Sequence, residues 1–147
     1  MSSSHMINHR QLKMFMTPAE IKQHVDVNSG ELEETYADEP DPGSGGYYNY
    51  RKETPDELWE RKTDESWDNG LAQSIEQKGV SRAVDIVHGP APYDDIDARD
   101  TSRPWLGNGY HRVAAAQDVR GSDELIPVEH HETFDPVWKK AMNEKSW

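Results

Sequence analysis

The chain contains no cysteine among its 147 residues, which excludes disulfide bonds, thiolate metal ligands and cysteine nucleophiles. Long apolar runs are also missing, and none approaches the ~20 residues that a membrane-spanning helix needs. The beginning of the sequence is polar and Ser-rich, without the pattern of a signal peptide. These absences together lead us to expect a cytoplasmic protein.

Positive charge is scarce as well. Lys and Arg number 16 against 28 Asp and Glu, which gives a net charge of −12, and no segment is densely basic. Binding to the phosphate backbone depends on clustered Lys and Arg, so we expect binding to duplex DNA to be weak or absent. The acidic balance is better suited to a basic protein partner.

Hydrophobic residues make up only 33% of the chain, which predicts one small domain with arms that do not all pack into a core. The sequence divides into four parts. We expect an N-terminal arm with a short strand and a helix, an acidic Gly-rich linker or loop, a core domain, and a C-terminal helix. Their ranges are residues 1–27, 28–53, 54–132 and 133–147.

Local signals mark the helices. Thr17-Pro18-Ala19-Glu20 and Thr54-Pro55-Asp56-Glu57 are capping boxes with proline at the first helical position, so helices should begin at residues 18 and 55. Leu71 and Ile75 lie on one helical face, and Gly79 is suited to end that helix. By contrast, residues 26–46 hold seven acidic residues and no Lys or Arg, and we expect them to lack regular structure.

The segment 104–116 carries the most specific functional signal. Residues 104–106 (Pro-Trp-Leu) predict a strand, and Gly107-Asn108-Gly109 predicts a sharp turn because Gly and Asn tolerate positive φ. The Ala-rich run after it predicts a helix. Such a turn directs unpaired N–H groups and the positive end of the helix dipole at one point. His111 and Arg112 fall in the first helical turn, so we expect their donors to converge on an anion.

This segment belongs to a longer pattern. Residues 71–80 read L-x-x-S-I-x-x-x-G-V, residues 84–87 predict a strand, residues 109–115 read G-x-x-R-x-x-A, and residues 126–128 read I-P-V. The order resembles the ParB N-terminal and sulfiredoxin-like superfamily over about residues 58–132. The resemblance implies an α/β (α+β) fold, with a small mixed sheet and packed helices. It also implies a phosphate or nucleotide pocket formed by Ser74, Asn108, Gly109, Tyr110, His111 and Arg112.

The resemblance has limits that are set by individual residues. Sulfiredoxins resemble G-C-H-R at this turn and use the cysteine for redox chemistry, whereas Tyr110 stands there in this chain. Partition ParB proteins resemble G-E-R-R and bind CTP. The resemblance therefore implies a ligand such as CTP or ATP with Mg²⁺, without implying a reaction. We interpret Tyr110 mainly as a packing residue and Asn108 mainly as a turn residue.

Three functions remain open. The first is binding of a nucleotide or phosphodiester at the Gly-x-x-Arg turn. The second is a nuclease acting on DNA, because small ParB-like proteins, many of them encoded by phages, carry that label by resemblance; a phage protein would act in the cytoplasm of its host. The third is a non-catalytic acidic protein that binds a basic partner. Arg51, Lys52, Arg61 and Lys62 would favour the nuclease if the fold gathers them near Arg112.

No metal site is predicted. The acidic segment 94–100 lacks the ligand spacing of a calcium loop, so we interpret it as a solvated loop. His130 and His131 are adjacent on a predicted strand and should point to opposite faces, which prevents both from binding one ion. Four tryptophans are predicted to anchor the core, namely Trp59, Trp67, Trp105 and Trp138.

Overall fold

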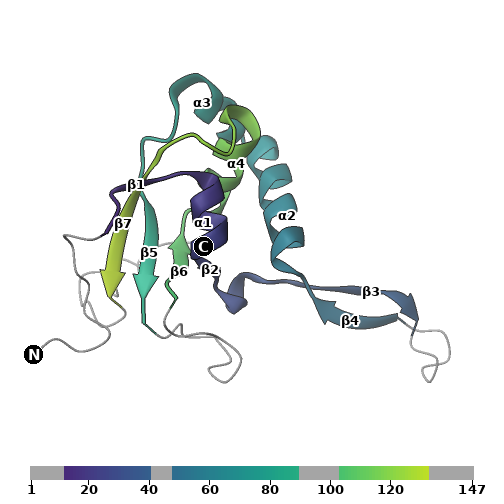
Figure 1. Cartoon of the computed structure of the whole chain (residues 1–147). Helices are drawn as coiled ribbons and strands as arrows, with labels where there is room; N and C mark the ends of the chain where they lie inside the picture. The colour runs from purple at the N-terminus through teal and green to yellow at the C-terminus, as the bar shows by residue number, and fades with distance from the viewer. Residues whose placement is uncertain (1–11, 41–47, 90–102, 133–147) are drawn as a thin grey trace, which may run out of the picture.

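A computed structural model describes residues 12–40, 48–89 and 103–132. It has the α+β fold that the sequence predicts, with helices packed on a mixed sheet (Figure 1). The helices are α1 (Pro18–His24), the short 3₁₀ turn η1 (Ser29–Glu31), α2 (Pro55–Asp68), α3 (Leu71–Lys78) and α4 (Tyr110–Arg120). The strands are β1 (Phe15–Met16), β2 (Asp26–Val27), β3 (Glu34–Pro40), β4 (Tyr48–Lys52), β5 (Val84–His88), β6 (Trp105–Asn108) and β7 (Ile126–Glu132).

The helix boundaries follow the local signals. Both capping boxes form: the Glu20 N–H donates to Thr17 Oγ1 over 3.1 Å, and the Glu57 N–H donates to Thr54 Oγ1 over 3.2 Å. Helix α3 ends at Gly79, which has φ 74° and therefore a backbone that favours glycine. The prediction of these helix ends from sequence is confirmed.

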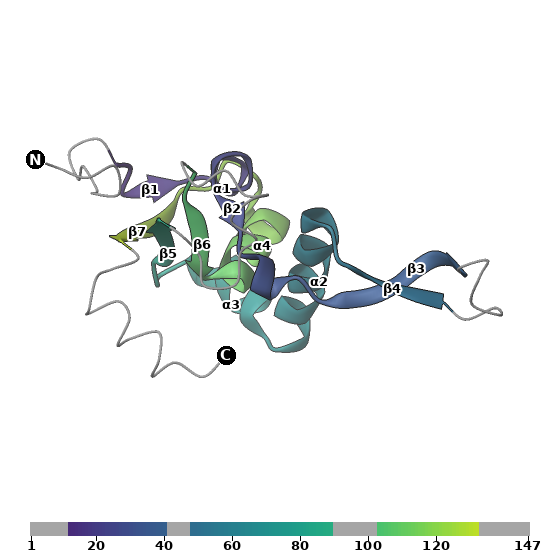
Figure 2. The same cartoon turned by 90° about the horizontal axis from the view of Figure 1, so that it is seen from below.

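The main sheet has the strand order β1-β7-β5-β6-β2. Strand β5 lies at its centre, parallel to β7 and antiparallel to β6, while the short edge strands β1 and β2 pair with β7 and β6. Helix α4 lies between the sheet and α2, and it contacts α1, α2, α3 and β5 (Figure 2). This position holds the start of α4 at the end of the central strands.

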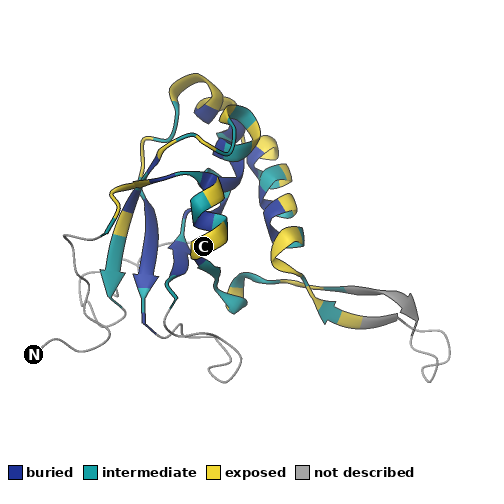
Figure 3. Cartoon of the chain, in the orientation of Figure 1, coloured by how far each residue is buried: buried dark blue, intermediate teal, exposed yellow. Residues whose placement is uncertain are grey.

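The core forms between the sheet and the helices, and its buried residues follow the inner faces of both (Figure 3). Ile21, Leu58, Ile86 and Val113 are among its fully buried members. Trp59 and Trp105 are buried as predicted, and Trp138 lies outside the described residues. The prediction for Trp67 is wrong: its side chain is 39% exposed, because its indole N–H lies at the surface and donates to Asp118 over 2.7 Å.

The prediction that residues 26–46 lack regular structure, as part of a linker over 28–53, is wrong for the described part. Strand β2 joins the main sheet, and β3 and β4 form an antiparallel hairpin that extends away from the start of α2 (Figures 1 and 2). Cations from distant positions compensate the local acidity: Arg103 Nε donates to Asp26 over 2.8 Å, and Arg61 Nη1 lies 3.4 Å from a Glu33 carboxylate oxygen. Composition within the segment could not reveal these partners.

Two further expectations fall on undescribed residues. The C-terminal helix predicted for 133–147 and the acidic loop at 94–100 both lie outside the described ranges. Among the helices within those ranges, none has the length and apolar character that a membrane span requires.

Candidate functional site

The turn between β6 and α4 has the predicted strand-to-helix form. Gly109 precedes the helix with φ 106°, and the Val113 N–H donates to its carbonyl over 3.0 Å to close the first helical turn. The expected role of Asn108 is corrected, because Gly107 and Asn108 belong to β6 and no described residue other than glycine has positive φ. The single glycine at 109 makes the turn by itself.

A cavity of about 460 Å³ opens at this turn. All six residues that the sequence analysis assigns to the site line it, so the fold brings Ser74 of α3 next to residues 108–112. The sequence analysis did not predict the other described residues that line the cavity. They come from η1, α2, α3 and the loop after α3, and are Glu31, Lys62, Leu71, Ile75, Gly79, Val80, Ser81 and Arg82.

Arg112 is the central charged group of the cavity. Its Nη2 atom would lie 3.0 Å from a Cβ atom on Gly109, which shows that the guanidinium folds back over the glycine. It is partly buried, and within the described ranges no hydrogen bond or ion pair joins it to another residue. Burial lowers the pKa of Arg112, the charge of Arg82 lowers it further, and the charge of Asp85 acts in the opposite direction. A guanidinium remains cationic despite such a shift.

A second cation reaches the cavity from α2. The Lys62 side chain is buried, its Nζ lies 3.4 Å from a Glu31 carboxylate oxygen, and it stands 5.7 Å from the centre of the Tyr110 ring. Lys62 lies in a helix with many charged residues, so its local sequence does not distinguish it from a lysine exposed at the surface. With Arg82, three cationic residues line the cavity among the described residues, against the one described carboxylate of Glu31.

His111 has a different environment from the one expected. Its Nε2 lies 3.0 Å from a Glu65 carboxylate oxygen, so one of its two ring nitrogens faces α2. Burial raises the pKa of Glu65, but the hydrogen bond with His111 and the charges of Lys62 and Arg61 together leave that pKa below its ordinary value. The ionised carboxylate of Glu65 therefore competes with any external anion for His111.

Tyr110 uses its hydroxyl inside the fold. The hydroxyl donates to the Leu106 carbonyl over 2.6 Å and accepts from the Asn28 N–H over 2.9 Å, and the residue is only 4% exposed. Its ring packs against Trp59 with the centroids 5.5 Å apart. These contacts agree with the packing role that the sequence suggests, although the residue also lines the cavity.

The other cations considered for a basic groove are mostly neutralised. Arg51 makes two hydrogen bonds to Glu57, over 2.6 and 2.9 Å, and lowers the pKa of that carboxyl to about 2. Arg61 donates to both oxygens of Glu53, over 2.9 and 2.8 Å. Among Arg51, Lys52, Arg61 and Lys62, only Lys62 lines the cavity.

Comparison of the chain with protein-family models, with curated proteins and with solved structures finds no match. The α+β fold and the geometry of the cavity are therefore the basis for assigning a function.

Proposed function

We propose that this protein binds a phosphate-bearing ligand, a nucleotide or a phosphodiester, in the cavity at the start of α4. One observation carries the proposal: Arg112 is a partly buried guanidinium that faces a cavity and makes no hydrogen bond or ion pair within the described part of the chain. Withdrawing a cation from water is costly unless an anion or several acceptors replace the water. A phosphate supplies both.

The helix start supplies donors in addition to the side chain. No described side chain caps α4, because its N-cap is Gly109. The first N–H groups of a helix have no partner inside the helix, and the helix dipole favours negative charge at this end. Arg112 adds a planar fork that matches two phosphate oxygens. Lys62 and Arg82 add charge to the same cavity.

The size and the walls of the cavity favour a ligand larger than inorganic phosphate. Its volume of about 460 Å³ falls within the range of ~300–1,000 Å³ that is usual for small-molecule sites. Leu71, Ile75 and Val80 add apolar surface to the lining. Apolar side chains suit a sugar and base, while the cationic side chains suit phosphates. A nucleotide such as CTP or ATP, with Mg²⁺ on its phosphates, is the ligand class that we propose first.

Of the two other functions that the sequence leaves open, the structure disfavours the nuclease and is compatible with the acidic interaction protein. A nuclease needs a basic path for DNA, and the ion pairs of Arg51 and Arg61 with Glu57 and Glu53 reduce the charge available for one. A non-catalytic acidic protein is compatible with the net charge of −12. Of the three functions, ligand binding is the one that accounts for the cavity and for the guanidinium of Arg112 that lines it.

Calorimetry with CTP, ATP, GTP and a short DNA strand, each with and without Mg²⁺, tests the proposal. We expect one nucleotide site per chain, with an affinity that falls roughly ten- to hundredfold in Arg112→Ala and less in Arg112→Lys, because Lys keeps the charge without the fork. Arg51→Ala is the matched control, since it removes one positive charge outside the cavity. If the wild-type chain binds no nucleotide at millimolar concentration, the proposal fails and the acidic interaction protein becomes the better assignment.

A further inference from the structure

The central strands bring together three ligand-type side chains outside the cavity. Strands β5 and β7 are parallel neighbours in which Asp85 pairs with Glu129 and Val87 pairs with His131. Successive residues of a strand point to opposite faces. Val84, Ile86 and Val128 belong to the core. Asp85, Glu129 and His131 therefore occupy the sheet face that is turned away from that core.

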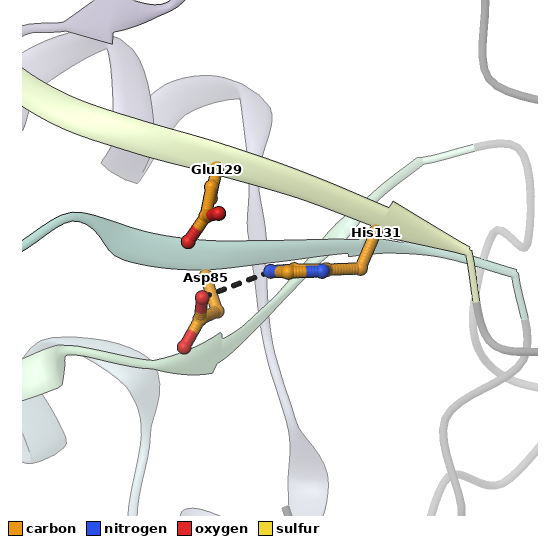
Figure 4. Close-up of side chains that lie close together, drawn as sticks. All are labelled: Asp85, Glu129 and His131. Atoms are coloured by element: carbon orange, nitrogen blue, oxygen red, sulfur yellow. Dashed lines mark hydrogen bonds and ion pairs between the residues drawn. The ribbon is translucent and has the colours of Figure 1, made fainter. Parts of the chain in front are cut away.

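The three side chains converge on one another, as Figure 4 shows. His131 Nε2 lies 2.9 Å from Asp85 Oδ1, and one ligand atom from each of the three residues lies within 4.8 Å of the others. Asp85 is buried, with 6% of its surface exposed, whereas His131 is partly buried and Glu129 is exposed. The carboxylate of Asp85 is therefore fixed by its surroundings, the imidazole of His131 is held by its hydrogen bond, and the exposed side chain of Glu129 can rotate.

We propose that Asp85, Glu129 and His131 form a binding site for a divalent first-row transition-metal ion. Ligand atoms at ~2.0–2.2 Å from such an ion lie roughly 3 Å apart when they are adjacent in its coordination sphere. The His131–Asp85 separation of 2.9 Å already has this value. The proton of this hydrogen bond leaves to solvent or moves to Nδ1 of His131 when the ion binds. Glu129 reaches the ion by rotating its exposed side chain, without movement of the strand.

A hydrogen bond between His131 and Asp85 alone explains only two of the three residues. The Glu129 carboxylate makes no hydrogen bond or ion pair with the described residues, yet it extends toward a buried carboxylate on the neighbouring strand. Like charges at paired positions destabilise a sheet. A bound cation removes that repulsion and uses all three groups.

The donor set selects the class of metal. Imidazole nitrogen suits Zn²⁺ and other transition ions, while carboxylates also suit Mn²⁺. Ca²⁺ takes six to eight oxygen ligands, so a three-residue set with one nitrogen is poorly matched to it. Three protein ligands leave at least one position for water, as in catalytic zinc sites.

Sequence reasoning predicts no metal here because it treats His130 and His131 as the candidate pair. The two do diverge: the imidazole Nε2 of His130 lies 2.7 Å from the Lys13 carbonyl, and His131 turns toward Asp85. The spacing that places two ligands on one face is instead Glu129-x-His131 within β7, and Asp85 of the parallel strand β5 is the third ligand. No local pattern connects Asp85 to residues that far along the chain.

Zn²⁺ titration of the full chain by calorimetry, without nucleotide, tests the site, and Mn²⁺ titration followed by electron paramagnetic resonance tests its preference. We expect one Zn²⁺ site per chain that Glu129→Gln and His131→Gln each weaken by about tenfold or more, given that even supporting residues of metal sites cost 10–100-fold. Glu132→Gln is the matched control, because it removes one carboxylate from the same strand at a position whose side chain alternates to the other face.

Equal Zn²⁺ affinity in the wild type and in Glu129→Gln would place the ion elsewhere on the acidic surface and overturn the proposal, as would the absence of binding to the wild type at 1:1 stoichiometry. Glu129 is exposed, so this variant should fold normally, and far-ultraviolet circular dichroism checks that it does. Arg112→Ala should keep the Zn²⁺ site while its affinity for nucleotide falls. The two proposals can therefore fail separately.

Discussion

Gly109 and Val84 meet so closely that a Cβ atom at position 109 would lie 2.5 Å from Val84 Cγ1. The contact joins the start of α4 to the first residue of the central strand β5. Gly109 also has φ 106°, a backbone angle that residues with a side chain rarely adopt. Both the backbone angle and the close approach require glycine, and together they set the distance between the helix start and the sheet.

We expect Gly109→Ala to destabilise the protein more than Gly70→Ala does. Gly70 also precedes a helix with a left-handed backbone, at φ 83°, and a Cβ atom added there would have no described neighbour within 4 Å, so it isolates the backbone strain of about 1–2 kcal/mol. Gly109→Ala adds a clash with Val84, which should cost a further ~1–3 kcal/mol. Urea unfolding of both variants measures the difference. Equal losses in the two variants would show that the contact with Val84 relaxes without cost.

Tyr110→Phe should destabilise the fold while leaving nucleotide binding unchanged. The substitution leaves the Leu106 carbonyl and the Asn28 N–H without their hydroxyl partner, and an unsatisfied buried group costs about 1–3 kcal/mol. Urea unfolding measures the loss, and calorimetry with ATP measures the affinity. A large loss of ATP affinity in a folded Tyr110→Phe protein would instead show that the hydroxyl contacts the ligand.

The sequence predicts those features that depend on neighbouring residues. The capping boxes at Thr17 and Thr54 act within one turn, so their helices could be predicted, and the turn at Gly109 follows from a glycine before an Ala-rich run. Ser74 is assigned to the cavity through the resemblance, and it does line the cavity.

Features that depend on distant contacts could not be predicted in this way. Lys62 lines the cavity because α2 packs against α4, and His111 faces Glu65 for the same reason. The pairing of β3 with β4 escapes prediction because the acidic composition of β3 resembles that of a linker, whereas register and pairing determine a strand. The Asp85 cluster needs the parallel pairing of β5 and β7.

Duplex DNA should bind weakly or not at all at about 0.15 M salt, where charge interactions beyond ~8 Å are screened. The reason is that Arg51 and Arg61 are already paired with Glu57 and Glu53, and the whole chain carries a net charge of −12. Fluorescence anisotropy with a labelled duplex measures the affinity. Submicromolar binding at this salt would contradict the prediction and support the nuclease assignment.

The Arg51–Glu57 pair should make stability depend on pH in the acidic range. The folded pKa of Glu57 is lowered from 4.5 to about 2, so its contribution is present above pH 4.5 and is lost as the pH falls toward 2. Glu57→Gln removes the charge but keeps a residue that is suited to the capping box. The difference in unfolding temperature between wild type and Glu57→Gln should therefore shrink from about pH 6 to about pH 2. A constant difference would show that the ion pair adds nothing.

His111 and Arg112 are adjacent in the first turn of α4, yet they should contribute unequally to nucleotide binding. Arg112 offers a fork that no described residue engages, and charge-assisted hydrogen bonds of about 1.5–3 kcal/mol correspond to a roughly ten- to hundredfold loss of affinity in Arg112→Ala. His111 already lies 3.0 Å from Glu65, so His111→Ala should change the ATP dissociation constant by no more than about threefold, which is about 0.7 kcal/mol. Calorimetry of both variants compares them directly. Comparable losses would mean that His111 leaves Glu65 to bind the phosphate, and Glu65→Gln should then strengthen binding by removing the competing carboxylate.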